Sequence, residues 1–200
     1  MAPNKQVFAV MCDLSMLYMS TRDMGRVKYS EITEYLKDRF SEYEVEFFGW
    51  TNFFAGNAGQ LKFINILKSM GWTIRKFLPK ETSLISGSEQ EISTKFIERL
   101  CFRHDASMAY AMAAFTFQQK RICLISGSFP LAEPLMRAAR MLDYKPFIMF
   151  PANVMDLRWW GLINQDQLEF ISFDDWFFND TSSEQDQKVD SSFADDFLVK

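Results

Sequence analysis

Histidine is almost absent from this sequence, which has a single one, His104, among its 200 residues. Zinc sites use clustered His and Cys ligands, and a Ser-His-Asp triad needs a histidine held by a carboxylate. The three cysteines (Cys12, Cys101 and Cys123) lie far apart and match no metal-ligand spacing. We therefore expect neither a zinc site nor such a triad, and we interpret the cysteines as reduced thiols of a cytoplasmic protein.

Long apolar runs are also missing, since no stretch approaches the roughly 18 apolar residues of a membrane-spanning helix. The first residues, MAPNKQ, lack the charged-then-apolar pattern of a secretory signal. We expect a cytoplasmic protein with no membrane partner. The 48% hydrophobic content supports one well-buried core, and we predict one domain over 1–178 followed by a tail over 179–200.

The tail carries the whole net charge of −4, because six of the 26 acidic residues but only two of the 22 basic ones lie beyond 178. The remaining body is balanced, which argues against a strongly basic protein that coats phosphates. Such an acidic segment cannot bury enough apolar surface to order itself. Its end, Ser191–Lys200, mixes acids with Phe193, Phe197 and Leu198, so it is either a docking peptide for a protein partner or an inert solubilising segment.

The chain begins its main pattern with a short apolar run, Val7–Cys12, which has the length of a strand buried on both faces and is followed by Asp13. Strands and helices then alternate, which predicts an α/β class: a three-layer domain with a mainly parallel five- or six-stranded sheet flanked by helices. Expected strands cover 43–50, 72–78, 121–125, 145–150 and 168–173. Expected helices cover 31–40 (capped by Ser30), 60–70, a stretch opened by Asp105, 131–142 and 153–163.

The segments between these elements are less informative. Residues 19–30 and 51–59 have the composition of loops, and 80–91 form a polar excursion within the domain. The stretch 92–102 fits either a helix or a strand.

Three polar features follow predicted strands or open a helix: Asp13, Asp105 and the turn Ser126-Gly127-Ser128. In parallel sheets, ligands bind outside the carboxyl ends of the strands. Two carboxylates there can hold a divalent cation that activates water against a phosphodiester, and the turn offers backbone N–H groups to a phosphate. Asp13 could instead merely cap the helix or turn that follows it.

Three segments, in this order, resemble the NYN domains of the PIN-like ribonucleases. Asp13-Leu14-Ser15-Met16-Leu17-Tyr18 resembles the family's D-G-S-N-L-Y opening, and Arg103-His104-Asp105 with the Ala/Met-rich helix behind it resembles K-x-x-D-x-x-L-A. Leu124-Ile125-Ser126-Gly127-Ser128 resembles L-V-S-G-D-x-D-F. The order of elements fits over roughly 6–178, although only these segments are specific.

The resemblance implies a parallel sheet flanked by helices and a cluster of acids that uses Mg²⁺ or Mn²⁺ to cut RNA. On that basis Asp13 and Asp105 are the candidate catalytic and metal-binding residues. Candidates for contacts with RNA are Ser15, Arg22, Arg26, Lys28, Ser126, Gly127, Ser128 and Arg158.

The sequence departs from the family pattern at the acids. Ser128 stands where an acid is expected, and the next acid falls near Pro130, so half of the usual four carboxylates are missing. Asp23 or Glu133 could substitute for them. Because fewer acids weaken metal binding, we favour a degenerate nuclease site that binds RNA or regulates RNA processing without cutting. The alternatives are an active metal-dependent endoribonuclease with a reduced acid set, and a protein-interaction scaffold, including a homo-oligomer.

Other residues have two interpretations each. His104 could orient a carboxylate, or it could simply pack or cap. Arg158-Trp159-Trp160 could stack bases and grip a phosphate, although at helical spacing at least one Trp should face the sheet. Phe53-Phe54, in a Gly/Asn-rich segment, is a candidate exposed contact.

Overall fold

A six-stranded parallel sheet forms the centre of the protein. The computed structural model describes residues 5–21, 24–53, 57–77, 104–173 and 177–179. The strands lie in the order β4-β3-β1-β5-β6-β7, and every neighbouring pair is parallel. Their bounds are β1 Val7–Asp13, β3 Glu44–Asn52, β4 Trp72–Phe77, β5 Arg121–Ile125, β6 Phe147–Phe150 and β7 Glu169–Ser172. A small antiparallel pair joins β2 (Arg26–Val27) to β8 (Phe178–Asn179).

Strand β1 lies at the middle of the sheet and is buried at every residue after Val7. It pairs with β3 on one side and with β5 on the other. The chain proceeds outward from β1 through β3 to β4, then returns beside β1 as β5 and proceeds the other way through β6 and β7. This is the Rossmann-like order, and ligands of such sheets bind where it reverses, here between the carboxyl ends of β1 and β5.

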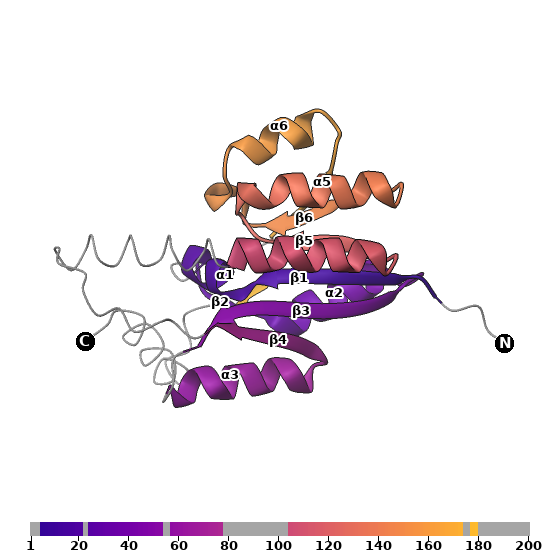
Figure 1. Ribbon diagram of the computed structural model, residues 1–200. Coiled ribbons are helices and arrows are strands. Elements are labelled where there is room, and N and C mark those ends of the chain that lie inside the picture. The colour runs from indigo at the N-terminus through magenta and orange to yellow at the C-terminus, as the bar shows by residue number, and fades with distance from the viewer. Residues whose placement is uncertain (1–4, 22–23, 54–56, 78–103, 174–176, 180–200) are drawn as a thin grey trace, which may run out of the picture.

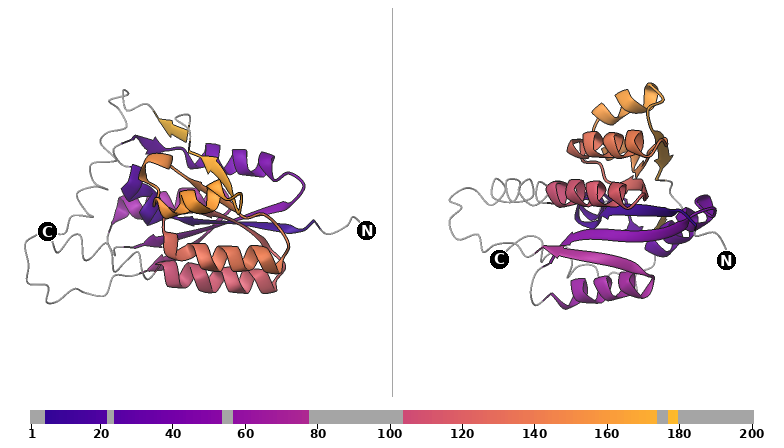
Figure 2. Two further views of the ribbon diagram at one scale, coloured as in Figure 1. Left: turned by 90° about the horizontal axis from the view of Figure 1, so that it is seen from above. Right: turned by 45° about the vertical axis from the view of Figure 1, so that its right-hand side comes forward.

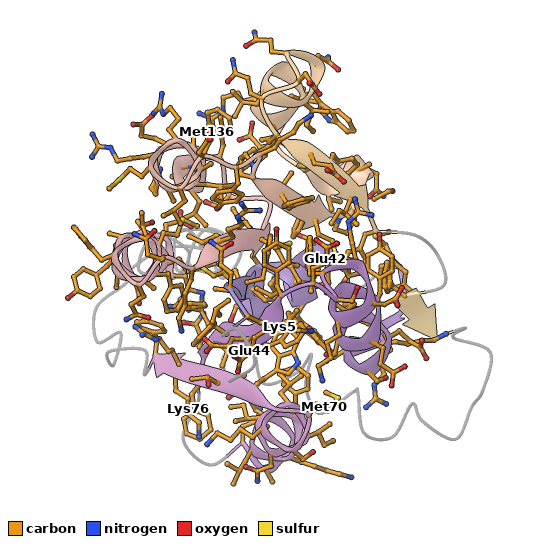
Figure 3. The ribbon with its side chains drawn as sticks, turned by 90° about the vertical axis from the view of Figure 1, so that its right-hand side faces the viewer. Lys5, Glu42, Glu44, Met70, Lys76 and Met136 are labelled. Atoms are coloured by element: carbon orange, nitrogen blue, oxygen red, sulfur yellow. The ribbon has the colours of Figure 1, made fainter. Side chains whose placement is uncertain are left out.

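Helices cover both faces of the sheet. They are α1 (Leu14–Thr21), α2 (Tyr29–Arg39), α3 (Ala58–Ser69), a helix over 104–117, α5 (Ala132–Met141) and α6 (Arg158–Asn164), with 3₁₀ turns η1 (Phe129–Leu131) and η2 (Ala152–Val154). The 104–117 helix and α5 lie side by side on one face, and α2 lies on the opposite face (Figures 1 and 2). Figure 3, which looks along the strands, shows the same three layers. The predicted fold class is confirmed.

The structure corrects the start of the chain as predicted from composition. Residues 19–21 are not loop, because α1 follows β1 directly and buries Leu14 and Leu17. Helix α2 begins at Tyr29 with Lys28 at its N-cap and no side-chain cap. Ser30 therefore lies inside the first turn and is not the cap.

Two later boundaries also differ. Strand β3 continues to Asn52, since Thr51 and Asn52 still pair with β4, so residues predicted as loop belong to the sheet edge. The predicted helix over 153–163 is divided into η2 and α6. It breaks at Met155, whose backbone is extended (φ −76°, ψ 142°). Asp156 then accepts a hydrogen bond from the Arg158 amide at 3.0 Å, which closes the turn into α6.

Several predictions fall outside the described residues: the segments 80–91 and 92–102, the side chains of Arg22, Asp23 and Phe54, and the tail over 180–200. Among the helices that the structure describes, none has the length and apolar character needed to cross a membrane.

Candidate functional site

Asp13 ends β1 and is buried, with no solvent-exposed surface. Its Oδ1 accepts two hydrogen bonds, from the Met16 amide at 2.9 Å and from His104 Nδ1 at 3.0 Å. Its Oδ2 has no hydrogen-bond partner. Asp13 therefore caps α1, as Asp does well, and at the same time holds the histidine that comes from a different layer of the fold.

His104 lies between two oxygen atoms from neighbouring strands. Its Nδ1 meets Asp13, its Nε2 lies 3.0 Å from Asn52 Oδ1, and its ring centroid is 5.1 Å from that of Phe77. The side chain is entirely buried. Of the two interpretations that the sequence allowed, the geometry is that of a histidine orienting a carboxylate.

Asn52 is a site residue that the sequence analysis missed. Its backbone N–H donates to Ser15 Oγ at 3.0 Å, and its backbone carbonyl accepts a hydrogen bond from the buried Gln60 side chain. Ser15, proposed from the sequence as an RNA contact, is buried and joins the end of β3 to α1. The sequence does place a polar residue, Asn52, shortly after the predicted strand 43–50. The Gly/Asn-rich composition of 51–59 made that position look like a loop.

Asp105 lies one residue after His104 and belongs to the same site. Its Oδ2 accepts a hydrogen bond from Ser128 Oγ at 2.7 Å, while its Oδ1 is buried and unpartnered. Burial, followed by the charge of Asp13, raises the pKa of the Asp105 carboxyl, and the hydrogen bond from Ser128 and the proximity of His104 partly offset this. The carboxyl is therefore harder to ionise than one in water.

The turn after β5 closes on itself. The Ser128 amide donates to Ser126 Oγ at 3.2 Å, and Ser126 in turn donates to Met16 Sδ at 3.4 Å. The Gly127 carbonyl accepts a hydrogen bond from Trp159 Nε1 at 3.1 Å. A Cβ at Gly127 would lie 2.6 Å from the Phe150 ring, so only glycine fits there. The turn lies against Asp105 as predicted, but its Ser128 amide already has a protein partner.

These contacts allow a direct test of whether the implied Mg²⁺ or Mn²⁺ fits. Mg²⁺ prefers six oxygen ligands, several of them water. The two unpartnered carboxylate oxygens, Asp13 Oδ2 and Asp105 Oδ1, are both shielded from solvent. In the parts of the chain that the structure describes, no three His, Cys, Asp or Glu side chains are grouped so as to hold a metal. The donor set in this arrangement does not fit such an ion.

Two cation–aromatic pairs lie at the carboxyl edge, on either side of the acids. On the β3–β4 side, Lys76 Nζ lies 4.3 Å from the centroid of Phe53. On the other side, the Arg158 guanidinium lies 4.4 Å from the centroid of Phe129, which follows the Ser128 turn. Both cations are exposed and both rings are partly buried.

Arg158 has its charge paired as well as stacked. Its Nε and Nη2 donate to the two carboxylate oxygens of Asp156 at 3.0 and 2.7 Å. This pair raises the pKa of Arg158 and lowers that of Asp156. The guanidinium is therefore held over the Phe129 ring with its charge offset, an arrangement better suited to stacking than to gripping a phosphate.

The remaining predicted residues are not among the hydrogen-bonding partners of Asp13 and Asp105 that the structure describes. Arg26 is exposed on β2, and Lys28 is partly buried at the start of α2. Glu133, considered as a substitute acid, is exposed on α5, and its Oε1 lies 3.8 Å from Nη2 of Arg140, about two turns further along the helix. That places its carboxylate with a cation of its own helix. Trp159 is buried, which confirms that one of the two tryptophans faces the interior.

Comparisons with known proteins identify the fold and little more. No family model matches the sequence, and no curated protein matches it. A crystal structure of a protein of unknown function from Vibrio parahaemolyticus has a TM-score of 0.59 and 17% identity, covering 89% of this chain and 98% of that one. Phytolacca americana UGT2, complexed with UDP-2fluoro-glucose and pterostilbene, has a TM-score of 0.40 and 17% identity over 76% of this chain and 31% of that one.

Proposed function

We propose that the carboxyl edge of the sheet is a degenerate nuclease-like site that binds single-stranded RNA without cutting it. The observation that carries the proposal is that protein donors hold both acids: His104 and the Met16 amide hold Asp13, and Ser128 holds Asp105. A carboxylate pair in a metal-dependent nuclease depends on the cation to offset its charge. Here hydrogen-bond donors of the protein occupy carboxylate oxygens that a cation would otherwise contact.

RNA is the ligand that the surrounding residues favour, because the acids are flanked by stacking surfaces. Arg158 lies over the Phe129 ring, and its charge is already offset by Asp156. Phe53 with Lys76 offers a ring and a free cation on the other side. Base stacking on such surfaces tolerates any sequence, and one base contributes about 1–3 kcal/mol. The resemblance to NYN domains points to the same ligand.

The second candidate function is a metal-dependent endoribonuclease with a reduced acid set. The observation in its favour is that each acid keeps one unpartnered oxygen, Asp13 Oδ2 and Asp105 Oδ1. A buried oxygen without a donor attracts a cation. The site would have to open to admit the ion with its water ligands.

One experiment separates these functions. The full-length protein is titrated with Mn²⁺ in the presence of a labelled single-stranded RNA, and RNA retention, RNA integrity and melting temperature are followed together. We expect retention without cleavage and a melting temperature unchanged by millimolar Mn²⁺. Binding of a cation to the folded state alone would raise that temperature by mass action.

Asp13→Asn is the decisive variant, because an amide of the same shape can still accept from Met16 and His104. Mn²⁺-dependent cleavage that disappears in this variant would replace our proposal with the nuclease. Absence of both cleavage and retention would leave the scaffold function. Arg158→Ala, which removes the stacked guanidinium, should weaken retention while leaving the acids untouched.

A further inference from the structure

The outer face of the 104–117 helix is apolar, although it faces solvent. From Ala106 to Phe117 the helix contains no charged residue. Its inner face packs Met108, Met112 and Phe115 into the core. Its outer face exposes Tyr110 by 75% and Phe117 by 81%. A helix that is hydrophobic on all sides is normally buried on all sides, so we expect this exposed face to pack against another molecule.

The exposed residues have the spacing of a helix–helix seam. Ala106, Tyr110, Ala113 and Phe117 are all exposed and are separated by four, three and four residues. This is the repeat that brings side chains onto one stripe and lets them interlock with a facing helix. We call these four residues the outer stripe.

The size pattern of the outer stripe is complementary to its own reverse. Read forward it is small, large, small, large, and read backward it is large, small, large, small. Two copies that run antiparallel about a twofold axis between Tyr110 and Ala113 place each Tyr110 against the other copy's Ala113. The same axis places each Phe117 against the other copy's Ala106. Alternating large and small residues across a contact is what fills it without voids.

The neighbouring helix extends this surface. A groove of about 350 Å³ separates the 104–117 helix from α5. Ala113 and Phe117 line one side of it, and Ala138 and Met141 line the other together with the charged Glu133 and Arg137. Met141 is itself 62% exposed. The two helices lie side by side and outermost on this face (Figure 2). The groove borders Ala113, where a facing tyrosine ring would rest.

We propose that the outer stripe is the contact of a homodimer, in which the 104–117 helices of two copies pack antiparallel. A twofold axis makes the same patch serve both subunits, so a self-complementary pattern is what such a contact requires. Ala113 and Phe117 lie further along the helix than His104 and Asp105, which belong to the carboxyl-edge site. Dimerisation and RNA binding are therefore separable properties.

Sedimentation velocity of the full-length chain over about a hundredfold range of concentration tests the proposal, because the dimer fraction follows mass action. We expect the wild type to shift from monomer to dimer. Ala113→Glu places two carboxylates beside the axis and should abolish the dimer, and Phe117→Glu serves as a second variant. The matched control is Leu61→Glu, an equally drastic change at an exposed apolar residue of α3, which should leave the dimer intact.

Circular dichroism confirms that each variant is folded before its mass is interpreted. A wild type that stays monomeric throughout would overturn the proposal and assign the stripe to another protein. A dimer unchanged in Ala113→Glu and Phe117→Glu would show that copies meet elsewhere.

The direction of packing is tested by cross-linking under mild oxidation. Mixing the Tyr110→Cys chain with the Ala113→Cys chain should give a disulfide dimer that neither wild type nor Tyr110→Cys alone gives. A cross-link in Tyr110→Cys alone, at least as fast as in the mixture, would indicate parallel helices and contradict the antiparallel arrangement.

Discussion

A carboxylate buried as completely as that of Asp13 needs donors, and His104 and the Met16 amide supply them. Burial of an unpaired charge is costly, whereas a buried pair is tolerated when its geometry is good. The single histidine of the chain is thus placed where it satisfies an acid at a strand end. Because Asn52 holds the other side of the ring, the carboxylate of Asp13 is fixed from three elements of the fold.

Asp105 gives a pH-dependent prediction. Burial and the charge of Asp13 raise its folded-state pKa above the ordinary value of 3.8. Between pH 3.8 and the raised folded-state pKa, the folded chain binds more protons than the unfolded chain. The unfolding free energy therefore falls as pH rises through that window. Asp105→Asn cannot titrate and should not show this loss. At neutral pH we expect the variant to be as stable as wild type or mildly more stable. At pH about 4 the difference between variant and wild type should shift in favour of wild type.

Urea unfolding at several pH values measures this difference. Ser128→Ala removes the hydrogen bond that lowers the Asp105 pKa, so it should enlarge the pH dependence that Asp105→Asn removes. A loss of more than about 1 kcal/mol in Asp105→Asn at neutral pH would mean that the ionised carboxylate stabilises the fold, contrary to our account.

Particular residues show how far the sequence could lead. Asp13 and Ser128 could be predicted because strand-length apolar runs end beside them, and parallel strands bring such ends together. Asp105 could be predicted because it opens the Ala/Met-rich helix. Asn52 could not, because its segment has the composition of a loop and only pairing with β4 makes it strand. The contact of His104 with Asp13 joins residues 91 positions apart, and no local pattern encodes it.

At the scale of elements, the β5–η1 turn is held in place by close packing against β6. Any side chain at Gly127 would meet the Phe150 ring at 2.6 Å. We expect Gly127→Ala to destabilise the protein by roughly 1–3 kcal/mol, since overpacking forces neighbours off their rotamers. Phe150→Leu, made in the same chain, should recover part of that loss by removing the ring.

Gly161 in α6 is the matched control, because a Cβ there has nothing within 4 Å. Gly161→Ala should stabilise the protein by up to about 1 kcal/mol through helix propensity. Thermal and urea unfolding of the two alanine variants should therefore change in opposite directions. If both cost the same, the destabilisation would reflect loss of glycine in general and not the contact with Phe150.

At the scale of the whole molecule, the body of the chain carries no net charge. Acidic and basic residues balance over 1–178. Lys5 lies at the amino-terminal end of β1. Glu44, which begins β3, and Glu42, just before it, lie near Lys5 (Figure 3). Among the described residues, Arg75 and Lys76 near the end of β4 are exposed cations, while the charge of Arg158 is paired with Asp156.

RNA binding at the carboxyl edge should weaken as salt rises, because Lys76 neutralises a phosphate. Each phosphate neutralised on a single strand contributes about −0.7 to the slope of log affinity against log salt. Fluorescence anisotropy with a labelled single-stranded RNA between about 50 and 200 mM KCl measures it. Lys76→Ala should make the slope shallower by about 0.7, because it removes one phosphate contact.

Arg158→Ala and Lys5→Ala separate stacking from charge in the same assay. The first, made together with Asp156→Asn so that no unpaired carboxylate is left, should weaken binding equally at every salt concentration, since the guanidinium acts by stacking on Phe129. The second should change neither affinity nor slope, because Lys5 lies at the opposite end of the strands. An effect of Lys5→Ala as large as that of Lys76→Ala would place RNA on a different surface and refute binding at the carboxyl edge.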